Sequence, residues 1–266
     1  MRGRVLICAG SDSGGGAGIQ ADIKTVTMLG GFAATAVTAL TAQNTQGVFG
    51  VIAVPPAFIA QQMRLVLDDI GADAIKTGML HSADVIAAVS GVLAEQAASS
   101  PLVVDPVMVA KGGAPLLEED AVAALRQTLI PRATVITPNL PEAEKLCGSV
   151  VRDVASMRRA ADSLLALGCH AVLLKGGHLE GDVVVDLLAT RAGIEAFESP
   201  RIQTTNTHGT GCTLASAIAT GLAQTLSLRD AVVRARGYVH RAILTAPRLG
   251  RGHGPLNHAH PLEGKL

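Results

Sequence analysis

Residues 206–212, Asn-Thr-His-Gly-Thr-Gly-Cys, run directly into a stretch of small apolar residues that is typical of a buried helix. The first backbone N–H groups of a helix have no partner within the helix, and the helix dipole adds partial positive charge at that end. Glycine lets an anion approach the backbone closely. The segment therefore predicts an anion-binding helix start, formed by Gly209, Thr210, Gly211 and Cys212, that suits a developing oxyanion or a transferring phosphoryl group.

Cys212 falls in the first turn of that helix. Positive potential at a helix start favours a thiolate, which would make Cys212 a possible base or nucleophile. A free cysteine is also often a small core residue, so a tight turn before a buried helix explains the same pattern. The segment alone leaves both interpretations open.

Two further charged residues follow short apolar runs. Asp105 comes after Leu-Val-Val, and Lys175 comes after Ala-Val-Leu-Leu and precedes two glycines. A lysine at this point could set its ammonium against phosphate oxygens, and the aspartate could face a metal or the phosphates. The alternatives are a surface lysine with a buried stem and an aspartate that bonds the local turn.

Asn139 and Glu142 stand three residues apart at the start of an expected helix. This spacing puts both side chains on one helical face, where they could bind a hydrated Mg²⁺. It is also the spacing of a capping box, in which the asparagine and the glutamate satisfy the first backbone N–H groups.

A glycine-rich stretch, residues 10–18, follows the first apolar run. The loop is too long for a dinucleotide-binding fingerprint and lacks the acidic residue that should follow it, and no Gly-Lys-Ser/Thr of a Walker A loop occurs. Such a loop could instead surround a small planar ligand. Gln43, in Ala-Gln-Asn-Thr, offers an amide that suits an aminopyrimidine edge, although turn formation explains that polar group equally well.

Short Val/Ile/Leu-rich runs alternate with helix-period segments along the chain, which predicts a parallel sheet covered on both faces. Ligands bind beyond the carboxyl ends of such strands, and most of the residues above follow a strand. The expected strands are 5–9, 34–42, 74–77, 102–105, 135–137, 171–175 and 183–188. The expected helices are 18–29, 57–70, 83–96, 118–129, 142–146, 155–167, 211–223 and 228–244, with an irregular tail from residue 250.

The composition excludes several classes of protein. Zero formal net charge and 2% aromatic residues argue against nucleic-acid binding. The cysteines at positions 8, 147, 169 and 212 show no spacing typical of a disulfide framework or a zinc site. No signal peptide or membrane-spanning apolar run is evident. We expect a soluble cytoplasmic protein with reduced thiols.

Taken together, the motifs resemble the hydroxymethylpyrimidine/phosphomethylpyrimidine kinases of thiamine biosynthesis, members of the ribokinase-like superfamily. The resemblance covers nearly the whole chain and rests on Ala-Gly-Ser-Asp-Ser-Gly-Gly-Gly-Ala-Gly-Ile-Gln-Ala-Asp (9–22), Thr-Ala-Gln-Asn-Thr (41–45), Lys-Thr-Gly-Met-Leu (76–80), Asp-Pro-Val-Met-Val-Ala-Lys (105–111), Thr-Pro-Asn-Leu-Pro-Glu-Ala (137–143), Leu-Lys-Gly-Gly-His (174–178) and Asn-Thr-His-Gly-Thr-Gly-Cys-Thr (206–213). It implies one α/β domain over residues 1–266, a ribokinase-like three-layer α/β/α sandwich with a mostly parallel central sheet.

Such kinases use ATP and Mg²⁺ to phosphorylate 4-amino-5-hydroxymethyl-2-methylpyrimidine to its monophosphate and then to the pyrophosphate. The resemblance implies a homodimer and gives each matching position a role. In this sequence the pyrimidine would contact Gln43, Asp22 and Met79. ATP would contact Lys175 and Asn139, and Mg²⁺ would contact Glu142 and Asp105. Gly209 to Cys212 would form the anion hole, with Cys212 as a thiolate base for the hydroxymethyl proton.

One segment departs from the family pattern. The family commonly reads Ala-Lys-Ser-Gly-Asp-Pro-Leu-Leu where residues 110–117 read Ala-Lys-Gly-Gly-Ala-Pro-Leu-Leu, and we expect this segment to form a mobile flap over the site. A pyridoxine or pyridoxal kinase on the same fold is the nearest alternative function, since its substrate is also a planar ring with a hydroxymethyl group. A non-catalytic nucleotide-binding protein is the alternative from a different class.

Overall fold

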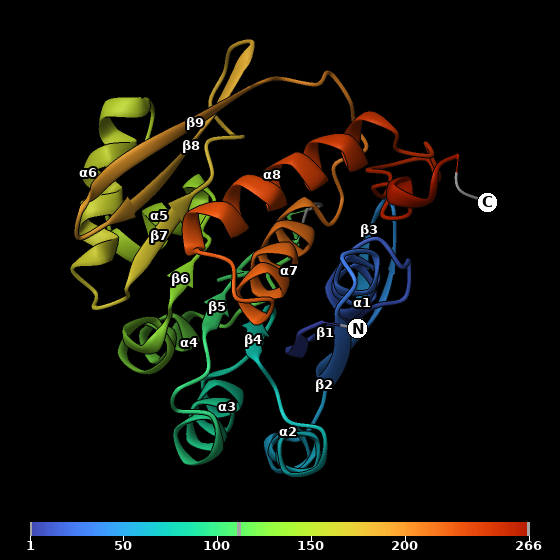
Figure 1. Cartoon of the computed structure of the whole chain (residues 1–266), viewed down its shortest axis with the longest axis vertical. Helices are drawn as coiled ribbons and strands as arrows, with labels where there is room; N and C mark the ends of the chain where they lie inside the picture. Colours follow the sequence, from blue (N-terminus) through green and yellow to red (C-terminus); the bar gives the residue numbers. More distant parts are fainter. Residues whose placement is uncertain (1, 111–112, 265–266) are drawn as a thin grey trace.

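The computed structural model describes residues 2–110 and 113–264. Within these residues the strands form a single nine-stranded sheet in the order β3-β2-β1-β4-β5-β6-β7-β8-β9 (Figure 1). The strands are β1 Arg4–Asp12, β2 Phe32–Asn44, β3 Gly47–Ala53, β4 Ala74–Thr77, β5 Leu102–Val104, β6 Val135–Ile136, β7 Ala171–Leu174, β8 Val183–Thr190 and β9 Gly193–Pro200.

The α-helices are α1 Gly18–Met28, α2 Pro56–Asp69, α3 Ala83–Gln96, α4 Glu119–Ala124, α5 Leu140–Cys147, α6 Val154–Leu165, α7 Thr210–Ala223 and α8 Leu228–Leu244. A π-helical turn, η1 Leu125–Leu129, and a 3₁₀ turn, η2 Ile130–Arg132, continue α4, and a second 3₁₀ turn, η3 His260–Leu262, lies near the C-terminus. No helix among the described residues combines the length and the apolarity needed to cross a membrane.

Two buried clusters on opposite faces of the sheet hold the layers together. Along β1, Leu6 and Cys8 belong to one cluster while Val5, Ile7 and Ala9 belong to the other, because successive side chains of a strand point to opposite faces. The first cluster includes residues of α2 to α6, and the second includes residues of α1, α7 and α8. The expected three-layer α/β/α arrangement is confirmed.

The sheet is mostly parallel, as predicted. Five neighbouring pairs, from β2-β1 through β6-β7, are parallel. Three pairs at the margins, β2-β3, β7-β8 and β8-β9, are antiparallel. The edge strands β3 and β9 were not predicted. Most side chains of β3 are exposed and those of β9 alternate between exposed and partly buried, so neither strand shows the continuous apolar run of a central strand.

Other elements agree closely with the expected ranges. The strand at 74–77 and the helices at 83–96 and 228–244 have the predicted bounds. The helix expected at 118–129 changes to π-helical turns after Ala124. The tail is largely irregular, and it packs on the rest of the chain through backbone bonds such as His253 N to Thr45 O at 2.8 Å.

The register of the parallel strands brings their carboxyl ends to one rim of the sheet. Cys8 pairs with Thr77, Thr77 with Val104, and Val104 with Ile136. The residues that directly follow these strands therefore lie side by side although they are far apart in the sequence. This alignment brings Asp105, Thr137 and Lys175 together.

Candidate active site

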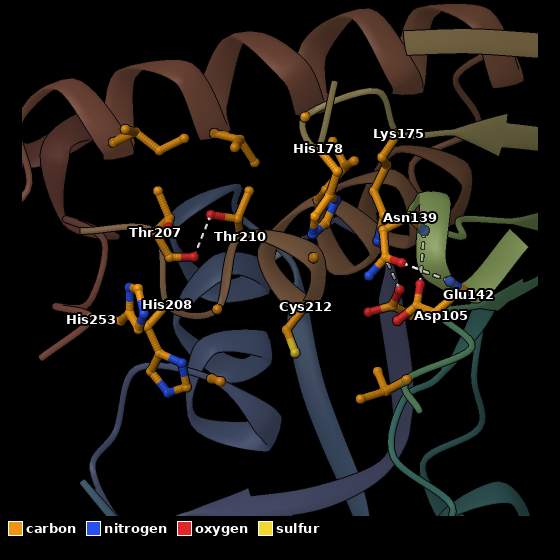
Figure 2. A pocket seen from close by; sticks show the side chains of 18 of the residues that line it. Asp105, Asn139, Glu142, Lys175, His178, Thr207, His208, Thr210, Cys212 and His253 are labelled. Carbon is orange, nitrogen blue, oxygen red and sulfur yellow. Dashed lines mark hydrogen bonds and ion pairs between the residues drawn. The ribbon is translucent and has the colours of Figure 1, made fainter. Parts of the chain in front are cut away.

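A cavity of about 1100 Å³ opens at this rim. Ten of the eleven residues predicted from the sequence line it; Asp22 does not. Figure 2 shows Asp105, Asn139, Glu142 and Lys175 as one group, with Cys212 between this group and His208 in that view. The lining residues predicted from the sequence are Gln43, Met79, Asp105, Asn139, Glu142, Lys175, Gly209, Thr210, Gly211 and Cys212.

The start of α7 depends on Gly209, because any other residue at this position would strain the backbone. Gly209 precedes the helix with φ of 82°, and a Cβ at this position would overlap the carbonyl oxygen of Gly16. Both the backbone N–H and the Oγ1 of Thr210 donate to Thr207 O, at 3.3 and 2.8 Å, and Gly211 and Cys212 of the first turn line the cavity. The geometry is that of an anion-binding helix start.

The ammonium of Lys175 and the carboxylate of Asp105 meet at this helix start. Lys175 Nζ lies 3.2 Å from Asp105 Oδ1, which also accepts from Thr137 Oγ1 at 3.1 Å. A Cβ built on Gly211 would lie 3.2 Å from Lys175 Nζ and 3.5 Å from Asp105 Oδ2. Burial acts to lower the pKa of Lys175, but Asp105 and then Glu142 outweigh it and raise that pKa. Lys175 therefore keeps its positive charge beside the first turn of α7.

Asn139 and Glu142 form a complete capping box. Asn139 Oδ1 accepts from Glu142 N at 2.9 Å, and Glu142 Oε2 accepts from Asn139 N at 2.8 Å. Glu142 is nevertheless only 6% exposed and lines the cavity. Burial, with a smaller effect from Asp105, raises the pKa of Glu142 to about 7, while Lys175 acts to lower it. The glutamate thus caps α5 and also presents a carboxyl group to the site, so the two interpretations of this motif are compatible.

The surroundings of Cys212 disfavour the thiolate that is expected from the sequence. Burial raises the pKa of Cys212 to about 12, and the nearby ammonium of Lys76 opposes this only in part. The helix dipole is too weak to outweigh removal of the sulfur from water. Cys212 is half-buried at the cavity as a neutral thiol.

Lys76 is a site residue to which the sequence analysis gave no role. Its side chain is fully buried, it lines the cavity, and its Nζ lies 2.9 and 2.8 Å from the two carboxylate oxygens of Asp22. Asp22 also accepts from Ser216 Oγ at 2.7 Å. Burial opposes the charge on Lys76, but Asp22 and then Cys212 and Asp105 raise its pKa, so the ammonium is retained. Asp22 thus lies behind the cavity wall and holds Lys76, rather than facing a ligand itself.

The glycine-rich loop is folded around Asp12 at the end of β1. The carboxylate of Asp12 accepts from Gly14 N, Gly16 N and Ala17 N at 2.7, 3.1 and 2.8 Å, and it lies 2.8 Å from His208 Nε2. Burial acts to raise the pKa of Asp12, but His208 and these backbone groups outweigh it and lower that pKa. Asp12 therefore joins the loop to the segment that precedes the helix start.

Gln43 faces the cavity beside this loop. Its amide contacts Thr41 Oγ1 at 3.1 Å and His208 Nε2 at 3.3 Å. His208, which the sequence did not single out as a site residue, thus links Gln43 to Asp12. In the segment expected to form a flap, Val109 and Pro115 form an isolated antiparallel bridge. Ala110 and Gly113 line the cavity, whereas Lys111 and Gly112 lie outside the described residues.

Comparison with known proteins shows the family to which this chain is related. The family model described as phosphomethylpyrimidine kinase matches residues 12–257. The chain belongs to this family. It is 47% identical to a hydroxymethylpyrimidine/phosphomethylpyrimidine kinase of Rhizobium meliloti, over 98% of both chains. It is 57% identical to a thiamine biosynthesis bifunctional protein of Geobacter sulfurreducens over 97% of this chain and 52% of that protein, and so spans about half the length of that relative.

Solved structures agree with the assignment. A Bacillus subtilis pyridoxal kinase, in complex with ADP, superposes with a TM-score of 0.90 at 37% identity over 97% of this chain and 98% of that one. A phosphomethylpyrimidine kinase from Clostridium difficile gives a TM-score of 0.80 at 40% identity over 90% and 99% of the two chains. The chain is a kinase of the ribokinase-like fold that uses ATP as co-substrate, which removes the support for a non-catalytic nucleotide-binding protein.

The raised pKa of Glu142 predicts a gain in stability when its charge is removed. Because the folded-state pKa is about 7, the folded protein binds the extra proton between roughly pH 4 and 7, and its stability falls as the pH rises through this window. Glu142→Gln keeps an oxygen for the cap. At pH 8 the free energy of unfolding of the variant should exceed that of wild type by up to about 3 kcal/mol, and near pH 4 the two values should be equal. Denaturant unfolding at both pH values tests this difference, and a variant less stable than wild type at pH 8 would contradict it.

The same variant should also lose Mg²⁺-dependent kinase activity by at least about a hundredfold, because Glu142 is one of the two carboxylates expected to bind the ion. An activity assay with ATP and Mg²⁺ measures this loss.

The buried Lys76–Asp22 pair predicts a different pattern. Lys76→Met leaves the Asp22 carboxylate buried without its ammonium and should cost about 3 to 5 kcal/mol of unfolding free energy. The double variant Lys76→Met/Asp22→Leu removes both charges and should recover most of that loss. If the ammonium acts on bound phosphates, the double variant should stay inactive although it is folded. Full kinase activity in that variant would show that the pair is only structural.

Proposed function

We propose that the chain phosphorylates 4-amino-5-hydroxymethyl-2-methylpyrimidine and then its monophosphate, with MgATP as the phosphoryl donor. Relatives named hydroxymethylpyrimidine/phosphomethylpyrimidine kinase are 45 to 49% identical over 96 to 98% of this chain. A single observation carries the proposal within the site: the first turn of α7, the ammonium of Lys175 and the carboxylate of Asp105 meet at one point of the cavity. Phosphoryl transfer depends mainly on such alignment and charge neutralisation.

The cavity has the right division for the two substrates. Its wall from β8, β9 and α8 is rich in apolar side chains, including Val184, Phe197, Val233 and Ile243, and we assign this part to the adenine of ATP. The triphosphate then extends toward Lys175, Asn139 and the start of α7. On the other side, Gln43 and Met79 form the acceptor end, where the amide of Gln43 suits the aminopyrimidine edge.

Asp105 and Glu142 are the residues that would bind Mg²⁺. No cluster of three or more His, Cys, Asp or Glu side chains suited to a metal occurs in the described part of the chain. Two carboxylates beside a phosphate site fit this ion, because Mg²⁺ in kinases is commonly bound through one or two carboxylates with water and substrate phosphates completing the shell. When bound, the ion would neutralise charge on the transferring phosphates.

The hydroxymethyl proton has to leave as the new O–P bond forms, and we propose that the thiolate form of Cys212 accepts it and becomes the thiol. Because the thiol has a pKa of about 12, only a small fraction is thiolate near neutral pH. Lys175 and the first N–H groups of α7 stabilise the transferring group independently of this proton. The second acceptor is a phosphate that is already largely ionised, so the second step needs no such base.

A pyridoxal kinase is the second candidate. Structural similarity supports this function at least as well as that of a pyrimidine kinase. The TM-score is 0.90 for the Bacillus subtilis pyridoxal kinase and 0.80 for the Clostridium difficile phosphomethylpyrimidine kinase. Sequence identity to that enzyme is 37%, below the 45 to 57% of the thiamine-pathway relatives, and Gln43 matches an aminopyrimidine. We therefore place the pyrimidine alcohol first.

We also propose a domain organisation, a location and an oligomeric state for the protein. Residues 1–266 form one domain, the protein acts in the cytoplasm, and two copies of it form a homodimer. Exposed apolar side chains on β3 and α2 support self-association; they are Phe49, Ile52, Phe58 and Leu65, each more than half exposed.

Product analysis with ATP, Mg²⁺ and the pyrimidine alcohol tests the function, with pyridoxine in parallel. We expect the monophosphate to appear first and the pyrophosphate to follow. Turnover of pyridoxine alone would replace the proposed function by the second candidate, and no turnover of either alcohol would overturn both.

The state of Cys212 predicts how a variant responds to pH. Below a pKa of about 12 the thiolate fraction rises about tenfold per pH unit. The ratio of wild-type to Cys212→Ser turnover should therefore grow between pH 7 and 9 in the first step and stay constant in the second. A first-step ratio that is independent of pH would rule out Cys212 as the base.

A further inference from the structure

The segment between β7 and β8 brings Lys175 to the cavity without being a helix or a strand. Lys175, Gly177 and His178 all line the cavity, and Figure 2 shows Lys175 and His178 together at its wall. A loop of this kind needs contacts from elsewhere to keep a lysine ammonium in one position, because an unrestrained lysine loses considerable side-chain entropy when it is ordered.

One side chain holds the later part of this loop, residues 177–182, whereas Lys175 itself is held by its backbone N–H, which donates to Pro138 O at 2.9 Å, and by Asp105. The guanidinium of Arg201, just beyond β9, donates to three carbonyl oxygens of the loop: Nε to Gly181 O at 2.6 Å, Nη1 to Gly177 O at 3.0 Å and Nη2 to Leu179 O at 2.5 Å. Its backbone N–H donates to Asp182 O at 2.8 Å. Arg201 therefore fixes the orientation of four peptide planes within six residues.

The start of the loop is held separately. Gly176 N donates to Asp186 Oδ1 at 3.0 Å, and Asp186 Oδ2 accepts from Arg236 Nε at 2.8 Å. A Cβ at Gly176 would overlap the carbonyl oxygen of Val185, so the backbone lies directly against β8. With one end fixed on β8, the contacts of Arg201 decide the path of the remaining residues.

Charge adds to this geometry. The partners of the Arg201 guanidinium named above are neutral carbonyl oxygens, so its positive charge is not cancelled by them, and Arg201 itself lines the cavity. A planar guanidinium with five N–H donors can reach three carbonyls at once, which a lysine ammonium on a flexible stem cannot reproduce.

We propose that Arg201 is a positioning residue for ATP: it shapes the loop of residues 177–182 so that the backbone beside Lys175 meets the triphosphate. This inference rests on the assignment of the Lys175 end of the cavity to ATP. It does not depend on which alcohol is the acceptor.

The test compares Arg201→Met and Arg201→Lys with wild type in the full-length protein. Arg201→Met should raise the KM for ATP about tenfold or more, since the loss of several hydrogen bonds to one loop is worth at least about one power of ten in binding. Its KM for the pyrimidine alcohol should change less than about twofold. The KM of Arg201→Lys for ATP should lie between those of wild type and Arg201→Met, because lysine keeps the positive charge but not the several donors of the guanidinium.

Arg229→Met is the matched control. Arg229 bonds to Glu195 of β9 through Nη2 and Nε at 2.7 to 3.0 Å, outside the cavity lining, and 58% of its side chain is exposed. Its loss should leave both KM values within about twofold of wild type. A general weakening of β9 would instead affect both arginine variants.

Calorimetric titration with MgATP, without any acceptor, separates this inference from the proposed function. Wild type should bind MgATP, and Arg201→Met should bind it about tenfold more weakly or worse. Equal affinity for MgATP, or equal increases in both KM values, would overturn the positioning role. If wild type binds MgATP but turns over neither alcohol, the proposed function fails and the affinity ratio still tests Arg201. If Arg201→Met does not fold, Arg201→Lys decides by the same two measurements.

Discussion

The site depends on one constraint: the N-terminus of α7 has to reach the carboxyl edge of the parallel sheet. Gly209 makes this possible, because its left-handed backbone lies so close to the Gly16 carbonyl that no side chain would fit. The first turn of α7 then meets the residues that follow β5 and β7. Sheet register, the glycine-rich loop and the helix dipole therefore act on the same few ångströms of space.

Charge balance explains why so many ionisable groups are buried there. Lys76 and Lys175 provide two ammonium groups, and Asp22, Asp105 and Glu142 provide the carboxyl groups that stabilise them. Burial nevertheless raises the pKa of Glu142 to about 7 although Lys175 acts to lower it. An arriving triphosphate adds negative charge and Mg²⁺ adds positive charge. We infer that the site is poised for ligands at some cost to the stability of the free protein.

The sequence predicted the layers, the parallel centre of the sheet and ten of the residues that line the cavity, because strand ends and helix starts leave local signals. It did not predict β3 and β9, whose exposed faces lack the apolar runs of the central strands. The role of Lys76 was missed because only the three-dimensional structure shows that Asp22, 54 positions away in sequence, neutralises it. The sequence also does not show how strongly burial disfavours the thiolate of Cys212, since the degree of burial that raises its pKa is not a local property.

A crystal structure with a non-hydrolysable ATP analogue, Mg²⁺ and the pyrimidine alcohol would test most directly whether the α7 terminus and Lys175 bind the triphosphate. We expect the terminal phosphate to lie at the first N–H groups of α7, within hydrogen-bond reach of Lys175 Nζ. We also expect the metal to contact Asp105 or Glu142 directly or through water, and the hydroxymethyl oxygen to lie near Cys212. A triphosphate that lies away from Lys175 and the α7 terminus would show that this part of the cavity is not the phosphate site.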